Sequence, residues 1–141
     1  MRVLFDTDVV LDVLQDREPF ADAASALFDE VNAGAVTGLL GATTATTLFY
    51  LLEKSVGRAA ALRKVRALLR RFDVAPVSRG VLEDALNLGF SDFEDGVLHE
   101  AGRGAGAEAV VTRNVDDFRG GALTVYTPDE LLALLRMRGG A

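Results

Sequence analysis

The chain has 141 residues, of which 50% are hydrophobic, and a formal net charge of −6. This length suits one domain, residues 1–141, with enough apolar side chains for a sizeable core. The absence of cysteine excludes disulfides, thiolate metal sites and a cysteine nucleophile. The negative charge disfavours a protein that binds nucleic acid through an excess of Lys and Arg, although a divalent cation in an acidic site would offset part of it.

No apolar run approaches the roughly 20 residues that span a bilayer. The N-terminus is short and charged and lacks the layout of a signal peptide. We therefore expect no membrane association and a cytoplasmic location.

The opening stretch of the chain contains a short apolar run followed at once by polar residues. Val3 to Phe5 favours a buried strand of a parallel sheet, and Asp6, Thr7 and Asp8 come directly after it. In open α/β sheets, ligands bind at the carboxyl ends of strands. These three side chains are therefore expected where a ligand or cation would be held.

The remaining chain alternates between patterns typical of helices and of strands. The expected strands lie at Val3–Phe5, within Ala35–Leu40, and at Val74–Val77, Ala109–Thr112 and Leu123–Tyr126. The expected helices lie at Val9–Leu14, Phe20–Ala33, Thr43–Val56, Arg58–Phe72, Arg79–Leu88, Ser91–Arg103 and Pro128–Arg138. Such alternation with short connections predicts an α/β fold whose parallel sheet is covered on both faces.

Polar residues mark several of the expected helix ends. Thr43 and Thr44 are candidate caps for a helix that is apolar on most sides and therefore expected to be buried. The stretches Ser91–Glu94 and Thr127–Glu130 both match the capping box, with Ser91 and Thr127 as the caps. Leu62, Val65, Leu68 and Leu69 are expected to face the core, and Gly139 and Gly140 to end the last helix.

Further acids occur at two other places in the expected fold. Asp92 and Asp95 lie on one face of a helix start, and a polar turn with Arg113, Asn114, Asp116 and Asp117 follows the strand Ala109–Thr112. Each group alone is also ordinary for a helix start or a loop. Together with Asp6 they form an oxygen-rich set that suits Mg²⁺ or Mn²⁺ and the hydrolysis of phosphodiesters. His99, one turn after Asp95, is either an outer partner of this site or, more commonly, a packed side chain.

Three motifs carry a resemblance to a known family. Phe5–Leu11 resembles the Asp-Thr-Asn-Val opening of PIN domains, Ser91–Val97 resembles their acidic helix start, and Val111–Phe118 resembles their late strand and turn. PIN domains form the fold of VapC-type toxin ribonucleases. The resemblance implies a three-layer α/β/α fold with a central, mainly parallel sheet, and a metal-dependent endoribonuclease from a toxin–antitoxin pair.

The resemblance also assigns roles to individual residues. Asp6 matches the first family acid and Asp95 the third, while the second and fourth fall at Thr47 and Asn114, which are neutral. Glu53, six helix positions further on, points to another face and cannot replace the second acid. We therefore expect weaker metal binding than in a four-acid site. The expected catalytic residues are Asp6, Asp95, Asp92 and Asp117, the expected metal ligands are Asp6, Asp95, Asn114 and Asp8, and the expected auxiliary residues are Thr7, Thr112 and Thr47.

Two other functions remain open at this stage. The neutral Thr47 and Asn114 also suit a PIN-like module that binds RNA or protein without cleaving. The pair Asp6 and Asp8 also resembles the haloacid dehalogenase phosphohydrolases, which need a lysine such as Lys54 or Lys64.

The expected partners are an RNA substrate, a second copy of the chain and an antitoxin that places basic side chains in the acidic cleft. The basic run within Arg58–Arg71 is either a solvated helix face or a phosphate contact. No residue is assigned to RNA binding.

Overall fold

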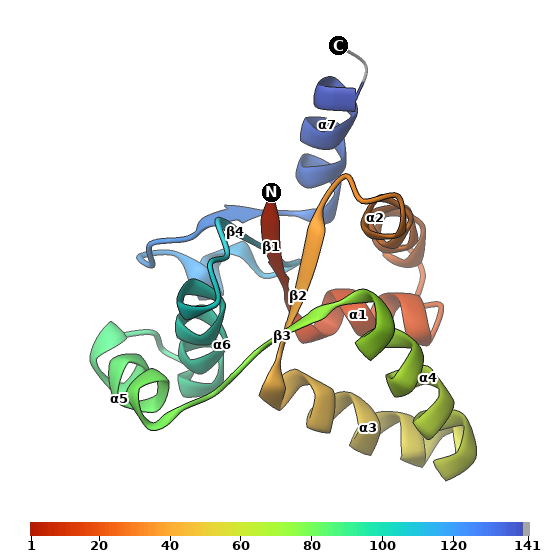
Figure 1. Ribbon diagram of the computed structural model, residues 1–141, viewed down its shortest axis with the longest axis horizontal. Coiled ribbons are helices and arrows are strands. Elements are labelled where there is room, and N and C mark those ends of the chain that lie inside the picture. Colours follow the sequence, from red (N-terminus) through yellow and green to blue (C-terminus); the bar gives the residue numbers. More distant parts are fainter. Residues whose placement is uncertain (140–141) are drawn as a thin grey trace.

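The computed structural model describes residues 1–139 and is built on one five-stranded parallel sheet (Figure 1). The strands are β1 (Arg2–Phe5), β2 (Thr37–Gly41), β3 (Asp73–Ala75), β4 (Ala109–Val111) and β5 (Thr124–Tyr126). Their order across the sheet is β3-β2-β1-β4-β5, and all neighbours are parallel. The predicted α/β class and parallel sheet are confirmed, and β1 lies at the centre.

Seven α-helices surround this sheet within residues 1–139. They are α1 (Thr7–Leu14), α2 (Ala21–Asn32), α3 (Ala42–Val56), α4 (Arg58–Arg71), α5 (Arg79–Leu88), α6 (Phe93–Gly104) and α7 (Pro128–Gly139), with a short 3-10 helix at Val115–Phe118. Over these residues, no helix is both long and apolar enough to cross a membrane. Gly140, expected at the end of the last helix, lies outside the described residues.

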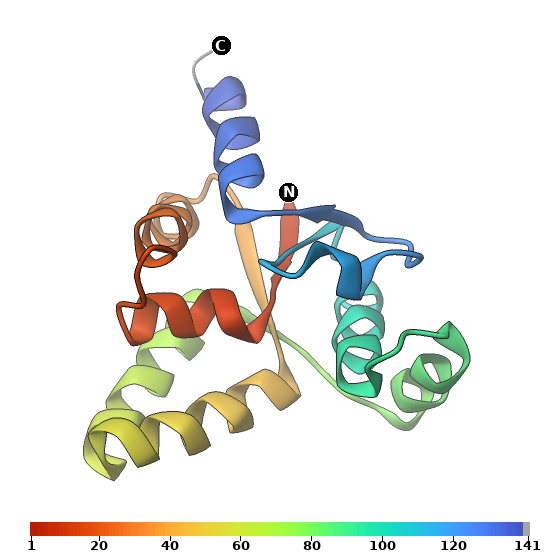
Figure 2. The same ribbon diagram turned by 180° about the vertical axis from the view of Figure 1, so that it is seen from behind.

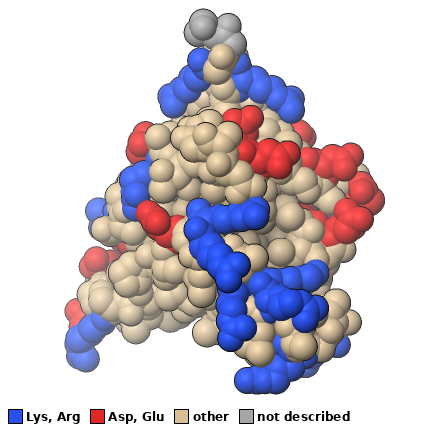
Figure 3. Space-filling view, turned by 45° about the vertical axis from the view of Figure 1, so that its right-hand side comes forward, with Lys and Arg blue, Asp and Glu red and all other residues tan. Residues whose placement is uncertain are grey.

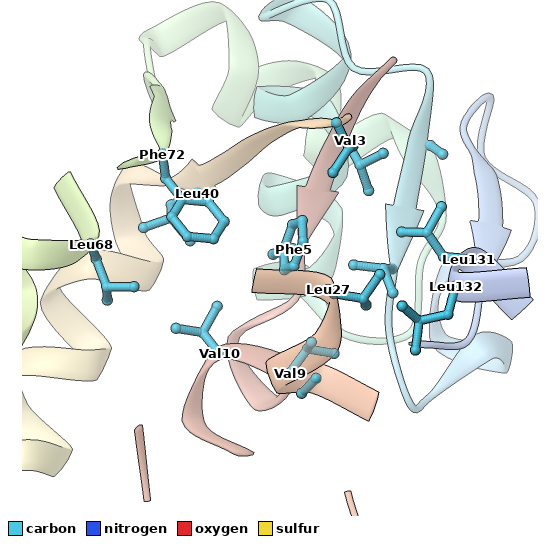
Figure 4. Close-up of a cluster of buried hydrophobic side chains, with 14 of the residues drawn as sticks. Val3, Phe5, Val9, Val10, Leu27, Leu40, Leu68, Phe72, Leu131 and Leu132 are labelled. Carbon is cyan, nitrogen blue, oxygen red and sulfur yellow. The ribbon is translucent and has the colours of Figure 1, made fainter. Parts of the chain in front are cut away.

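The central strand supplies side chains to both faces of the sheet, because successive residues of a strand point to opposite sides. Val3 and Phe5 pack with side chains of α1, α2, α4 and α7 in the larger core (Figure 4). Leu4 packs on the other face with Leu98 of α6. The result is the expected α/β/α arrangement of three layers, in which α1 and α6 lie on opposite faces of β1.

Two of the expected helix caps are wrong, and one is confirmed. The cap of α3 is Gly41, since β2 ends there and leaves no turn for Thr43 or Thr44, which lie inside the helix. The cap of α6 is Asp92 rather than Ser91, and its Oδ1 accepts a 3.2 Å hydrogen bond from the Asp95 N–H. Thr127 and Glu130 form the predicted reciprocal box, with bonds of 2.8 and 3.2 Å.

The predicted burial of α3 and of part of α4 is also wrong. Leu48 and Leu52 of α3 are buried, whereas Tyr50 and Val56 are about half exposed, as is Leu69 of α4. The reason is visible in Figures 1 and 2, where α3 leaves the end of β2 and runs beyond the sheet. A helix that extends past its sheet buries only one face.

Candidate functional site

An acidic cavity of about 300 Å³ lies at the carboxyl ends of β1 and β4. Within residues 1–139, its lining contains six carboxylates and no Lys, Arg or His. The lining residues are Asp6, Thr7, Asp8, Leu11, Thr47, Leu51, Asp92, Glu94, Asp95, Leu98, Asn114 and Asp117. All four expected catalytic residues and all four expected metal ligands therefore line one cavity.

Asp6 is the most buried of these acids, with 7% of its surface exposed. Its Oδ1 accepts a 2.8 Å hydrogen bond from the Thr7 N–H, and its Oδ2 accepts one of 2.8 Å from the Thr112 hydroxyl. Thr112 in turn accepts a 2.9 Å bond from the Asn114 N–H. Asp6 is thus fixed between the start of α1 and the end of β4.

The electrostatic surroundings of Asp6 oppose its negative charge. Burial raises the pKa of Asp6, and the charges of Asp8 and Asp117 raise it further, against the hydrogen bonds from Thr112 and Thr7. A buried carboxylate ordinarily has a cationic partner, because an unpaired charge in a protein interior is costly. Asp6 has no Lys, Arg or His partner within residues 1–139.

Asp95 faces the same cavity from the first turn of α6. Burial and then the charges of Asp6, Asp92, Asp117 and Glu94 raise the pKa of Asp95 to about 7. Acids from β1, α6 and the turn after β4 therefore repel one another in this cavity. A bound divalent cation would reverse that repulsion.

Asp8 and Asn114 form the outer part of the cavity. The Asn114 amide nitrogen lies 3.5 Å from Asp8 Oδ2, and the Arg17 guanidinium lies 3.5 Å from Asp8 Oδ1. Arg17 also donates to the Asp8 carbonyl at 3.3 Å. The charge of Asp8 is thus partly balanced, unlike that of Asp6.

Arg17 belongs to a buried charge cluster that the sequence did not reveal. Asp12, with 1% exposed, accepts hydrogen bonds from Arg17 at 3.0 Å and from Arg113 at 2.7 and 3.3 Å. The Arg113 guanidinium also lies 4.0 Å from the centre of the Phe20 ring. This cluster holds the chain next to Asn114 against α1. Its only sequence signal is an acid within an apolar helix pattern.

Three residues considered from the sequence lie outside the cavity. Asp116 is exposed and pairs with Arg119 at 2.8 Å. His99 is fully buried, its Nε2 accepts a 3.2 Å bond from the Leu123 N–H, and its Nδ1 faces Glu100 at 3.0 Å, so it is a packed side chain. Glu53 pairs with Arg58 on the surface. Of the expected auxiliary residues, Thr7 and Thr47 line the cavity, whereas Thr112 is buried behind it and donates to Asp6.

The family model described as "PIN domain" matches residues 2–116, which is most of the chain. The chain belongs to the PIN domain family. No curated protein is similar enough in sequence to count as a relative.

Solved structures share the fold of this PIN domain at low sequence identity. VapBC-1 from nontypeable Haemophilus influenzae is 13% identical, with a TM-score of 0.70 over 92% of this chain and 99% of that one. VapBC2 from Rickettsia felis, bound to a DNA fragment from its promoter, is 15% identical, with a TM-score of 0.67 over 90% and 98%. VapC20 from Mycobacterium tuberculosis, a toxin that cleaves the sarcin-ricin loop, is 14% identical, with a TM-score of 0.62 over 77% and 86%.

Membership of the PIN family replaces the haloacid dehalogenase alternative. The structure agrees, because neither candidate lysine reaches the acidic cavity. Lys64 donates to the Leu14 carbonyl at 2.9 Å, and Lys54 lies over the Tyr50 ring.

Proposed function

We propose that this PIN domain is a metal-dependent endoribonuclease and the toxin of a toxin–antitoxin pair. The observation that carries the proposal is the acidic cavity, in which Asp6 and Asp95 lie close enough to repel and no basic side chain of residues 1–139 balances them. Raised carboxylate pKa values in a cavity are typical of functional sites. PIN membership and the VapC neighbours support the choice of RNA as substrate.

The donor set fits a hard divalent cation that keeps part of its water shell. Among residues 1–139, no three Asp, Glu or His side chains are arranged to hold one ion together. Mg²⁺ commonly binds through one or two carboxylates and retains several waters. Asp6 and Asp95 would hold it, with Asp8 and Asn114 acting at the outer side. When bound, the ion would supply positive charge beside the phosphate and lower the pKa of water.

The other residues of the cavity would orient the reactants. Thr112 and the Thr7 N–H fix both oxygens of Asp6, so the carboxylate needs no rearrangement when an ion binds. Asp92 and Asp117 would accept hydrogen bonds from water that faces the phosphate. Thr47 lies at the position where the family resemblance places an acid, and its hydroxyl would form a hydrogen bond with the RNA substrate.

The first test compares metal binding and RNA cleavage in the wild type, Asp6→Asn and Asp116→Asn. Asp116 is the control acid, because it lies next to Asp117 in the turn after β4 but pairs with Arg119 outside the cavity. Calorimetry with Mg²⁺ and Mn²⁺ runs beside cleavage of a mixed RNA pool. We expect Asp6→Asn to lose both metal binding and RNA cleavage, and Asp116→Asn to retain both. A folded wild type that binds neither ion and leaves the RNA intact would refute the ribonuclease.

A second function is favoured by two observations at the cavity. The lack of a three-carboxylate cluster in residues 1–139 and the neutral Thr47 and Asn114 also suit a PIN domain that binds RNA or protein without cleaving it. Retained RNA binding in the presence of EDTA, with no cleavage at any metal concentration, would support that function.

The same cavity supports our proposal of an antitoxin partner. VapBC and FitAB structures with this fold are complexes. A partner segment with an Arg or Lys would balance the six carboxylates here, in competition with a metal ion. We expect an Arg-containing antitoxin peptide to raise the apparent Kd for Mn²⁺ of the wild type, and a peptide with Gln in place of Arg to leave it unchanged. Such a pair acts in the cytoplasm.

A second copy of the chain would cover an exposed apolar surface. Leu82 and Leu86 of α5 and Phe93 of α6 are 40%, 70% and 48% exposed. Contiguous apolar patches of this kind commonly mark interfaces. We expect sedimentation of the wild type as a homodimer and of Leu86→Glu as a monomer.

A further inference from the structure

Helix α4 is the most basic segment of an acidic protein. Its sequence, Arg58–Arg71, contains five arginines and one lysine and no acid. It therefore contributes +6 to a chain whose net charge is −6, so the rest of the chain sums to −12. In Figure 3, which brings the right-hand side of Figure 1 forward, basic side chains gather on the lower half of the molecule, where α4 lies.

Three of these arginines form one exposed row. Arg63, Arg66 and Arg70 are spaced at i, i+3 and i+7, so they lie on one face of the helix, opposite the buried Ala61 and Leu68. All three are exposed, and none forms an ion pair with a carboxylate of residues 1–139. We call Arg63, Arg66 and Arg70 the arginine stripe.

Helix α1 connects this region to the acidic cavity. Asp6 and Asp8 at the start of α1 line the cavity, and the carbonyl of Leu14 at its end accepts the 2.9 Å bond from Lys64 of α4. Since α1 has eight residues, its ends are about 12 Å apart. Lys64, in the middle of α4, thus lies about one short helix away from the proposed point of cleavage, and the arginine stripe lies on another face of the same helix.

We propose that the arginine stripe binds the phosphate backbone of the RNA strand whose scissile bond lies in the acidic cavity. This inference rests on the proposed function. An acidic protein with a carboxylate-lined site repels RNA, so attraction must come from a local basic surface. Arginine suits it, because the guanidinium binds phosphate oxygens in pairs.

RNA fits the stripe better than an acidic protein segment does. Ala67, which lies between Arg66 and Arg70 in the row, offers no large apolar anchor, and the half-exposed Leu69 lies at the edge of the row. Protein interfaces depend on such buried anchors. A row of charges without an anchor matches a flexible chain of phosphates.

The test replaces the stripe and a matched set of distant arginines. Arg63, Arg66 and Arg70 are changed together to Gln, which retains helix propensity. The control changes Arg79, Arg136 and Arg138 to Gln, which removes the same charge from α5 and α7. Fluorescence anisotropy with a labelled mixed-sequence single-stranded RNA is recorded in EDTA over a range of salt. Circular dichroism verifies the fold of each variant.

For the stripe variant, we expect affinity to fall at least tenfold at about 0.1 M salt and the slope of log K against log salt to shrink by about 2, which corresponds to three lost phosphate contacts. The control variant, which loses the same charge, should show a smaller fall in RNA affinity and a smaller change of the slope than the stripe variant. Equal effects in the two triple variants would overturn the proposal. So would unchanged RNA binding together with lost binding of polyglutamate, because that result assigns the stripe to an acidic protein partner.

Failure of the stripe and failure of the ribonuclease give different results. Suppose the wild type binds RNA but never cleaves it with Mg²⁺ or Mn²⁺, and the stripe variant loses this binding. That result would uphold the stripe and refute the ribonuclease. Cleavage by the wild type with the same KM in the stripe variant would refute the stripe alone. If both proposals hold, the stripe variant raises KM for long RNA and leaves kcat unchanged.

Discussion

Asp6 and Asp12 are two buried carboxylates at the two ends of one short stretch, and they are stabilised in different ways. Asp12 is 1% exposed and accepts three hydrogen bonds from Arg17 and Arg113. Asp6 is 7% exposed and accepts its bonds from a backbone N–H and a hydroxyl, with other acids nearby. Asp12 is therefore paired with two arginines, whereas Asp6 has no basic partner among residues 1–139.

Under the proposed function, this difference separates Asp12 as a structural acid from Asp6 as a functional one. Removal of a carboxylate with buried cationic partners leaves those partners uncompensated and destabilises the fold. Removal of a carboxylate without a cation relieves repulsion and costs the fold little, but it removes the attraction for an incoming metal ion. Stability and activity should therefore respond in opposite ways at the two positions.

The largest expected effect is on catalysis at Asp6. Asp6→Asn should lower the cleavage rate by a factor of at least about 100, because even outer partners of a metal site cost up to that much. The thermal midpoint of the metal-free variant should equal or exceed that of the wild type, since Asn also caps helices well. Scanning calorimetry in EDTA measures this, and a marked drop in the midpoint would show that Asp6 is structural.

The reverse result is expected at Asp12. Asp12→Asn should lower the free energy of unfolding by about 3 kcal/mol, because it leaves Arg17 and Arg113 without their buried acceptor. Urea unfolding measures the loss, with the exposed Asp22→Asn as the control. A loss no larger than that of the control would mean that the two arginines find other partners.

A smaller effect is expected from adding an acid to the cavity. Thr47→Glu should tighten Mn²⁺ binding by about tenfold, because the position lines the cavity and a carboxylate adds counter-charge. Thr46→Glu, one residue earlier and exposed, is the matched control. Calorimetry would contradict the expectation if both variants bound Mn²⁺ alike.

The smallest expected effect is the pH dependence that Asp95 gives to the metal-free protein. Its pKa is about 7 in the fold and near the ordinary 3.8 in the unfolded chain, so the folded state binds more protons between these values. Stability should therefore fall by a few degrees of thermal midpoint as pH rises from about 4 to about 7.

Two controls define this pH effect. Asp95→Asn should flatten the dependence, and saturating Mn²⁺ should also remove it, because the ion stabilises the charged form. Over the same range Mn²⁺ affinity should rise with pH. A wild type whose midpoint rises through this range in EDTA would place the titrating group elsewhere.

Much of the fold follows from local patterns in the sequence. Runs such as Val3–Phe5 and Ala109–Thr112 predict buried strands, and the reciprocal bonds of Thr127 and Glu130 agree with their capping box. The errors arise where tertiary geometry decides. Gly41 caps α3 because the strand runs directly into the helix, and α3 exposes Tyr50 because it extends past the sheet.

The positions of the acids in the site can be predicted from the sequence, but the residues that pair with the neighbouring acids cannot. Asp6, Asp95 and Asp117 each follow a strand or start a helix, and strand ends of a parallel sheet converge. The link between Arg113 and Asp12 spans most of the chain and leaves no periodic pattern, so only the structure reveals it. Asp116 shows the converse, since a loop acid next to Asp117 points to the surface.

The central position of β1 sets when the acidic cavity can form during synthesis. β1 is made first but pairs with β4, whose residues lie more than a hundred positions later, and Asp95 and Asp117 belong to that late part of the chain. Contacts of such long sequence separation form slowly and only after both segments are available. A nascent chain that ends before Asp117 therefore lacks the assembled cavity, which delays any activity of this site until β4 and the turn after it have been made.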